Sequence, residues 1–167
     1  MNALKLYRIS RFLYLHHIPL LPRVFSKLST WLYACKVPYK MHIGKNTKFA
    51  AGGLCLNING DSIGDNCVVG TGCVFMRSFP YKEKPKVGNN VYISHGVKLV
   101  GNIIIEDNVM IGANSVVTKS VPKNAIVVGI PAKIIGYTTD LDYDPFENEG
   151  YKEGWKPFLE DKRANKA

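Results

Sequence analysis

The sequence predicts a mainly β fold in which short strands wind into a three-sided prism, with a helical segment before it and an irregular tail after it. Two observations predict the prism: apolar residues recur every six positions, and glycine and asparagine keep fixed places within that period. A period of six is a multiple of the strand period of about two, and it does not match the helical period of about 3.6. With two irregular patches between them, the apolar anchors are Ile43, Phe49, Ile63, Val69, Phe75, Val87, Ile93, Leu99, Ile105, Ile111 and Val117.

Glycine and asparagine mark the corners of the expected prism. Glycine follows five of the eleven anchors directly: Gly44, Gly64, Gly70, Gly88 and Gly112. Asparagine stands three residues after six of them: Asn46, Asn66, Asn90, Asn102, Asn108 and Asn114. Both residue types tolerate a positive φ, so each repeat can form a flat wall and then a corner. Three walls close one coil of about 18 residues, and we expect the anchors to point inward.

Residues 1–36 are expected to form a helical cap. Leu4, Tyr7 and the cluster 12–15 recur at helical spacing, and Pro19 and Pro22 break the run before a second segment over Val24–Cys35. Packing on the prism is the favoured interpretation, and the basic, aromatic composition leaves open a peripheral contact with the inner membrane surface. The predicted boundaries are a cap over 1–36, a β-helix over 37–137, and an acidic, aromatic extension over 138–167 without regular structure.

Charge and composition exclude several classes of protein. Residues 1–139 hold 17 basic and 5 acidic side chains, a net charge of +12, which suits a partner that carries phosphate. No nucleic-acid-binding motif accompanies this charge, so nucleic acid is not expected as a partner.

No run of 18 apolar residues predicts a membrane-spanning helix, and Arg8 and Arg11 interrupt the N-terminal apolar run, so no secretory signal is expected. The expected location is the cytoplasm, with the inner face of the membrane as a further option.

The four cysteines are expected to be reduced thiols without a catalytic role. Cys67 and Cys73 occupy the small fourth place of two adjacent repeats, which suits a buried thiol. No cluster of cysteine and histidine has the spacing of a metal site, so no metal is expected.

The repeat region resembles the hexapeptide-repeat acyltransferases, whose fold is a left-handed parallel β-helix. The resemblance covers about residues 37–136 and is strongest over Val87–Gly136, which reads VGNNVYISHGVKLVGNIIIEDNVMIGANSVVTKSVPKNAIVVGIPAKIIG. The similar branches are the serine acetyltransferases and the O-acetyltransferases of surface polysaccharides. The resemblance implies transfer of an acetyl group from acetyl-CoA, as co-substrate, to a hydroxyl. It also implies a homotrimer with acetyl-CoA in the groove between two prisms.

The chain departs from the serine acetyltransferases at their catalytic histidines. The stretch Gly53–Gly64, where that branch carries an Asp-His pair, holds Asn57 and Asn59, and Lys84 stands where a second histidine would fall. Among the four histidines, His95 in the corner motif YISHGV is the candidate base, with contact to CoA or water as the alternative role. His16, His17 and His42 are expected to have structural or surface roles.

The resemblance implies residues that contact acetyl-CoA, and the break in the period indicates residues that contact the acceptor. Those expected to contact acetyl-CoA are Ser94, His95, Ala113, Thr118, Lys119 and Lys133. The segment Met76–Lys86 breaks the period and is expected to leave the prism as a loop over the acceptor. The expected acceptor contacts are Asn57, Asn59, Arg77, Tyr81 and Lys82.

Three functions follow from these observations. The first is an acetyl-CoA-dependent O-acetyltransferase acting on a hydroxyl of a sugar or of a surface-polysaccharide precursor. The second is a serine O-acetyltransferase, against which the missing Asp-His pair counts. The third is a catalytically silent, trimeric β-helix scaffold.

Overall fold

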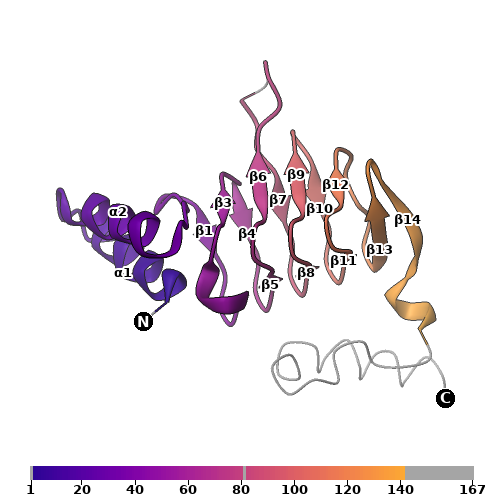
Figure 1. Ribbon diagram of the computed structural model, residues 1–167, viewed down its shortest axis with the longest axis horizontal. Coiled ribbons are helices and arrows are strands. Elements are labelled where there is room, and N and C mark those ends of the chain that lie inside the picture. The colour runs from indigo at the N-terminus through magenta and orange to yellow at the C-terminus, as the bar shows by residue number, and fades with distance from the viewer. Residues whose placement is uncertain (1, 81, 142–167) are drawn as a thin grey trace.

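A computed structural model describes residues 2–80 and 82–141, and these residues form a prism of short strands with two helices at one end (Figure 1). Helix α1 (Ala3–Leu15) and helix α2 (Leu21–Tyr33) come first. The strands are β1 (His42–Ile43), β2 (Lys48–Phe49), β3 (Asn57–Ile58), β4 (Ser62–Ile63), β5 (Val68–Val69), β6 (Val74–Met76), β7 (Lys86–Val87), β8 (Tyr92–Ile93), β9 (Lys98–Val100), β10 (Ile104–Ile105), β11 (Met110–Ile111), β12 (Val116–Val117), β13 (Ala125–Gly129) and β14 (Ala132–Tyr137). Two 3₁₀ turns, η1 (Ala50–Gly53) and η2 (Thr138–Asp140), complete the described chain.

The strands form the three walls of a parallel β-helix with about four coils, as the sequence predicts. The first wall has the order β1-β4-β7-β10, the second β14-β13-β11-β8-β5-β2, and the third β12-β9-β6-β3. Each strand pairs in parallel with the strand one coil away, except that β13 and β14 are antiparallel. A two- or three-residue strand forms no stable sheet alone, so the stacking of coils holds the walls together.

The core is the stack of anchors inside the prism. All eleven predicted anchors are buried, and Ile58 adds a twelfth in the first irregular patch. Their strand neighbours point outward, because alternate residues of a strand face opposite sides. The expectation that the anchors form the core is confirmed.

The corner between the first and second walls is an asparagine ladder. Asn46, Asn66, Asn90, Asn108 and Asn124 all have positive φ values, from 54° to 64°. Each side-chain Nδ2 donates to the Oδ1 of the next asparagine, over 3.2, 3.2, 3.0 and 3.0 Å. Asn114 also has a positive φ but lies at another corner, and Asn102 does not have one. At the turn of Asn102, the preceding residue Gly101 has the positive φ, of 98°. Asn102 is therefore the one predicted corner asparagine that does not adopt a positive φ.

Two insertions interrupt the period. Corner residues that contact each other across coils are 20 positions apart at Lys45 and Asp65, 24 apart at Asp65 and Asn89, and 18 apart at Asn89 and Asp107. The extra residues are the turn η1 in the first coil and the segment between β6 and β7 in the second. That segment projects away from the prism, as predicted (Figure 1).

The two helices pack against the N-terminal end of the prism. On α1, Tyr7 donates its hydroxyl to the Met41 carbonyl at 2.6 Å, and Arg11 Nη1 donates to the same carbonyl at 2.5 Å. Burial raises the pKa of Tyr7, so its hydroxyl remains a donor. The second helix begins at Leu21 rather than near Val24, because Pro22 lies in its first turn, where proline needs no backbone N–H. Within the described residues, no helix has the length and apolar character needed to cross a membrane.

The C-terminal end of the prism is closed by the hairpin of β13 and β14. Gly129, with φ 102°, and Ala132 face each other across the turn that contains Pro131. Most of the tail predicted to be irregular, residues 142–167, lies outside the described residues.

Candidate active site

His95 lies at the exposed corner between the second and third walls, in the turn that joins β8 to β9. Its Nδ1 accepts a hydrogen bond from the Thr71 backbone N–H at 3.0 Å and lies 2.8 Å from the Thr71 Oγ1. Thr71 occupies the same corner one coil earlier, and its carbonyl accepts from the Gly96 N–H at 2.8 Å. Sequence reasoning missed Thr71 because the inserted segment makes the step between them 24 residues rather than 18.

The backbone contact with Thr71 favours one of the two neutral forms of the His95 ring. A backbone N–H can only donate, so Nδ1 must supply a lone pair, and the neutral ring then carries its proton on Nε2. In this form Nε2–H is a hydrogen-bond donor directed away from the Thr71 contact. A general base at Nε2 needs the other tautomer, with Nδ1–H donating to Thr71 Oγ1 instead.

The corner continues into the next coil at Ala113. The His95 carbonyl accepts from the Asn114 N–H at 2.9 Å, so Ala113 lies beside His95 on the adjacent coil. On the coil before, Gly70 allows the turn of His95 to approach closely, because a Cβ at position 70 would lie 2.5 Å from the backbone nitrogen of His95. Thr71, His95 and Ala113 therefore form one column of turn residues, and Ser94 precedes His95 in the same turn.

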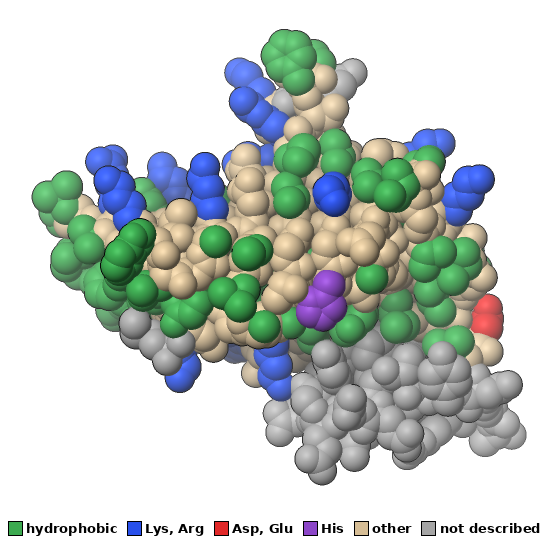
Figure 2. Space-filling model, in the orientation of Figure 1, with side chains coloured by type: hydrophobic (Ala, Val, Ile, Leu, Met, Phe, Trp, Pro, Cys, Tyr) green, Lys and Arg blue, Asp and Glu red, His purple; other side chains and the backbone are tan. Residues whose placement is uncertain are grey.

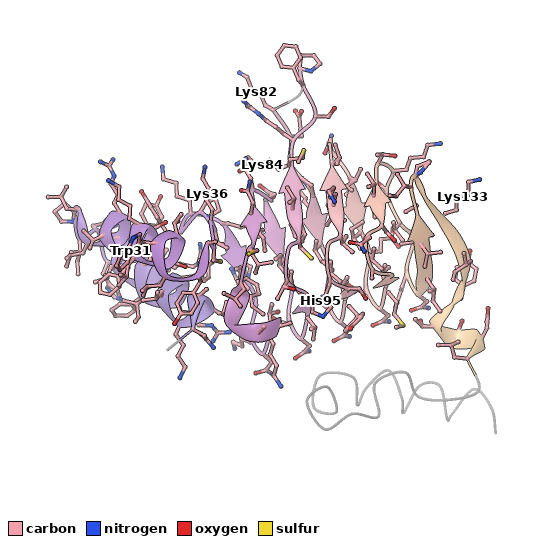
Figure 3. The ribbon with its side chains drawn as sticks, viewed as in Figure 1. Trp31, Lys36, Lys82, Lys84, His95 and Lys133 are labelled. Atoms are coloured by element: carbon pink, nitrogen blue, oxygen red, sulfur yellow. The ribbon has the colours of Figure 1, made fainter. Side chains whose placement is uncertain are left out.

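The other expected CoA contacts lie nearer the C-terminal end. Thr118 and Lys119 are exposed and follow β12, at the far edge of the third wall from His95. Lys133 is exposed on β14 opposite Val128 (Figure 3). The cationic side chains thus lie one to two coils beyond His95 along the prism.

The expected acceptor residues do not gather at His95 within one chain. Asn57 lies on β3 and forms a bridge with Lys36, while Asn59 lies beyond β3, toward the opposite edge of the third wall. Arg77 and Lys82 belong to the projecting segment, which leaves the prism on the side away from His95 (Figure 3). Tyr81 lies outside the described residues.

The buried cysteines have no accessible thiolate. Cys67 Sγ donates to the Gly88 carbonyl and Cys73 Sγ to the Ser94 carbonyl, each at 3.1 Å. Burial raises the pKa of Cys67 to about 12 and that of Cys73 to about 11. Burial and a raised pKa both disfavour Cys73 as a nucleophile, in line with the structural role expected for it. Among the described residues, no group of three His, Cys, Asp or Glu side chains could hold a metal ion.

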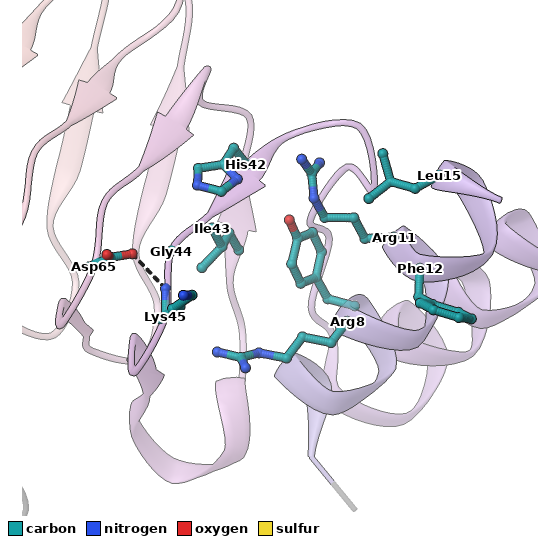
Figure 4. A pocket seen from close by; sticks show the side chains of 10 residues that line it. Arg8, Arg11, Phe12, Leu15, His42, Ile43, Gly44, Lys45 and Asp65 are labelled. Carbon is teal, nitrogen blue, oxygen red and sulfur yellow. Dashed lines mark hydrogen bonds between the residues drawn. The ribbon is translucent and has the colours of Figure 1, made fainter.

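A cavity of about 430 Å³ lies between α1 and the first coil, and sequence reasoning did not find it (Figure 4). Arg8, Arg11, His42 and Lys45 line it, with Asp65 accepting from the Lys45 backbone N–H at 2.6 Å. Arg11 is held by the backbone carbonyls of Lys40 and Met41. The spacing of Arg8 and Arg11 places them on one side of α1, but only the packing of α1 on β1 brings His42 and Lys45 to the same cavity.

Models of known protein families match the repeat region of the chain. The model for "Bacterial transferase hexapeptide (six repeats)" matches residues 84–119, and the model for "Hexapeptide repeat of succinyl-transferase" matches residues 42–77 and 62–95. The chain belongs to the hexapeptide-repeat transferase family. The predicted family resemblance is thereby confirmed.

The chain is similar to several serine acetyltransferases. It is 33% identical over 155 residues to that of Synechococcus elongatus, covering 88% of this chain and 61% of the relative. It is 38% identical over 135 residues to that of Staphylococcus epidermidis strain RP62A, covering 80% of this chain and 60% of the relative. The chain thus spans about three fifths of the length of these relatives.

Solved structures of serine acetyltransferases have the same fold. The Brucella abortus enzyme in complex with coenzyme A aligns with a TM-score of 0.75 at 27% identity, covering 81% of this chain and 55% of that one. The Neisseria gonorrhoeae enzyme in complex with serine aligns with a TM-score of 0.72 at 27% identity, covering 78% of this chain and 54% of that one.

Proposed function

We propose that this chain is an acetyl-CoA-dependent O-acetyltransferase whose reaction takes place at the His95 corner. The observation that supports this most is the fixed His95 side chain, exposed beside the stacked turns of Thr71 and Ala113. The relatives are serine acetyltransferases, and the Brucella relative is a complex with coenzyme A. In the reaction, the acceptor oxygen bonds to the acetyl carbon, the C–S bond breaks, and the hydroxyl proton ends on the CoA sulfur.

In this proposal His95 donates from Nε2–H to the thioester carbonyl oxygen as negative charge develops there. The Thr71 N–H favours the tautomer that this role requires. The general-base role predicted from the sequence stays a prediction that needs the opposite tautomer. Thr118, Lys119 and Lys133 remain proposed contacts to the CoA phosphates, since a lysine is a suitable point charge for phosphate.

Serine is the first acceptor to test. The Neisseria relative is a complex with serine, and the curated relatives carry the name serine acetyltransferase. A sugar hydroxyl is the second candidate, because the stretch Gly53–Gly64 holds asparagines and no histidine where the serine acetyltransferases are expected to carry an Asp-His pair, and Lys84 stands where a second histidine would fall. Neither the side-chain amide of an asparagine nor the ammonium group of Lys84 can replace a histidine base near neutral pH.

A homotrimer is part of the proposal. In one chain the projecting segment and His95 lie on opposite edges of the third wall (Figure 3). Arg77 and Lys82 can therefore meet a thioester at a His95 only if that histidine belongs to another copy. Asn57 and Asn59 stay proposed acceptor contacts on the wall between those edges.

The test begins with binding. CoA should raise the thermal unfolding temperature of the protein, since a ligand that binds only the folded state stabilises it. If CoA gives no such increase, the transferase proposal fails and a silent scaffold is left. If it does, release of free thiol from acetyl-CoA is measured with serine and with sugar acceptors. No acetyl transfer to either class would also contradict the proposal.

Three variants determine the role of His95. Removing one donor to a developing oxyanion costs about 10²–10³ in kcat, so His95→Ala should lose that factor. His95→Gln retains an N–H donor and should recover part of the loss, whereas a base could not be replaced by an amide. Thr71→Val keeps the backbone N–H and should have little effect. A large loss in Thr71→Val, without recovery in His95→Gln, would instead establish His95 as the base.

A further inference from the structure

Helix α2 leaves most of its large apolar side chains exposed. Its fully buried residues are Pro22 and Ser29, and the Pro22 carbonyl accepts from Ser10 Oγ of α1 at 2.6 Å. The apolar residues Leu21, Val24, Trp31 and Leu32, called the α2 stripe below, are all exposed. Leu21, Trp31 and Leu32 are three, seven and eight residues away from Val24, and these separations place all four along one side of the helix. Ser29 is 6% exposed and Trp31 is 82% exposed, which is the reverse of what their polarity favours.

The exposed apolar surface continues around the connection between the helices. Leu20, which precedes α2, is 72% exposed. On α1, Ile9 is exposed as well, whereas the exposed Phe12 and Leu15 line the cavity beside the first coil. Figure 2 shows hydrophobic side chains gathered over this end of the molecule. An exposed apolar surface of this kind indicates a binding surface, because single exposed apolar residues are common but clusters are not.

The charge around the α2 stripe is of one sign. Residues 1–48 carry nine lysines and arginines and no aspartate or glutamate. On α2 itself, Lys27 is three residues from Val24 and four from Trp31, so it borders the stripe. Arg23 lies one turn before Lys27 and is exposed as well.

These charges select the class of partner. A second copy docking through the same stripe would bring Arg23 and Lys27 against their own counterparts, and residues 1–48 hold no acidic side chain to pair with them, so self-association through the stripe is opposed by repulsion. A lipid surface with anionic headgroups attracts the same charges, and leucine and tryptophan side chains insert below its headgroups. We propose that the hairpin of α1 and α2 docks on an anionic phospholipid surface through the α2 stripe, with Arg23 and Lys27 at the headgroups.

The position of the hairpin is compatible with this docking. Trp31 lies at the helical end of the molecule, and His95 lies further along the prism (Figure 3). Docking at the helical end leaves the described coils of the prism away from the lipid. The inference rests on the surface of α2 alone and does not depend on the proposed acetyl transfer.

Vesicle binding tests the proposal directly. The full chain is sedimented with vesicles of phosphatidylcholine alone and with vesicles that also contain about 30 mol% phosphatidylglycerol, an anionic lipid. Binding is expected only to the anionic vesicles and should weaken as salt is raised. In a Trp155→Phe background, Trp31 is the one tryptophan left in the sequence, and its fluorescence should shift to shorter wavelength on binding.

Two matched pairs of variants identify the surface. Trp31→Ser should lower the affinity for anionic vesicles about tenfold or more, whereas Ile135→Ser, which removes an apolar side chain 64% exposed on β14, should not. Lys27→Glu should weaken binding about tenfold, whereas Lys123→Glu makes the same charge change at the other end of the prism without that effect. All four positions are exposed, so folding is expected to be retained and is checked by circular dichroism.

Several results would overturn the proposal. Equal binding to neutral and anionic vesicles, or none to either, would contradict the role of the charges. Equal losses within either matched pair would place the binding surface elsewhere. If Trp31→Ser changes the oligomer mass in ultracentrifugation without lipid, the α2 stripe is a protein interface instead.

Discussion

The asparagine ladder makes a quantitative prediction at Asn90. Its φ is 54°, its Nδ2 donates to Asn108 at 3.0 Å, and its Oδ1 accepts from Asn66 at 3.2 Å. In Asn90→Ala, the left-handed backbone costs about 1 kcal/mol, and the loss of each half-buried hydrogen bond costs about 0.5–1 kcal/mol. The free energy of unfolding should therefore fall by about 2–3 kcal/mol, which lowers the unfolding temperature by roughly 5–10 °C for a chain of this size.

Two control variants separate the contributions to this loss. Asn90→Gly also loses the two hydrogen bonds but tolerates the positive φ, so it should be less destabilising than alanine by about 1 kcal/mol. Asn102→Ala alters an exposed asparagine at the same place in the repeat but without a positive φ, and should change stability by less than about 0.5 kcal/mol. Thermal and urea unfolding followed by circular dichroism measure all three. Equal effects of Asn90→Ala and Asn102→Ala would refute the argument that corner geometry stabilises the prism.

Two further predictions concern the His95 corner and the thiols. Gly70→Ala places a Cβ 2.5 Å from the backbone of His95, so it should lower both the unfolding temperature and any acetyl transfer, whereas Gly136→Ala, with no atom within 4 Å, should change neither. A reduced unfolding temperature with full activity would show that the corner geometry is not needed for transfer. Native protein at pH 8 should react rapidly with a thiol reagent only at exposed Cys55, because burial raises the pKa of Cys67 to about 12. Unfolding should expose all four thiols, and rapid labelling of Cys67 in the native protein would contradict the buried core.

The raised pKa of Cys67 also predicts a loss of folding stability at alkaline pH. The Cys67 thiol keeps its proton in the folded protein up to about pH 12, while the unfolded chain releases it near its ordinary value of 9.0. Its contribution to stability is therefore present below pH 9 and is lost as the pH rises from 9 to 12. Cys67→Ala should reduce the alkaline decline of the unfolding free energy between those values. An unchanged decline would show that other groups cause it.

The sequence alone was sufficient to predict the prism, its core and the residues that carry the family resemblance. Each coil repeats the same local geometry, so the spacing of Ile93, Leu99 and Ile105 is sufficient to predict inward-facing walls. Asparagine at corners such as Asn90 is a local requirement of the backbone, and local requirements are visible in a sequence. His95 was found as a candidate for the same reason, since its place in the repeat puts it at a corner.

Only the tertiary structure determined what surrounds these residues. The contact of Thr71 with His95 depends on the length of the segment inserted between β6 and β7, and the cavity lined by Arg8 and His42 depends on how α1 meets the first coil. The pattern of α2 by itself favours burial of its apolar side, yet the packing of α1 buries Ser29 and leaves Trp31 exposed. Periodicity shows that a helix has two sides, and only contacts between distant segments decide which side is covered.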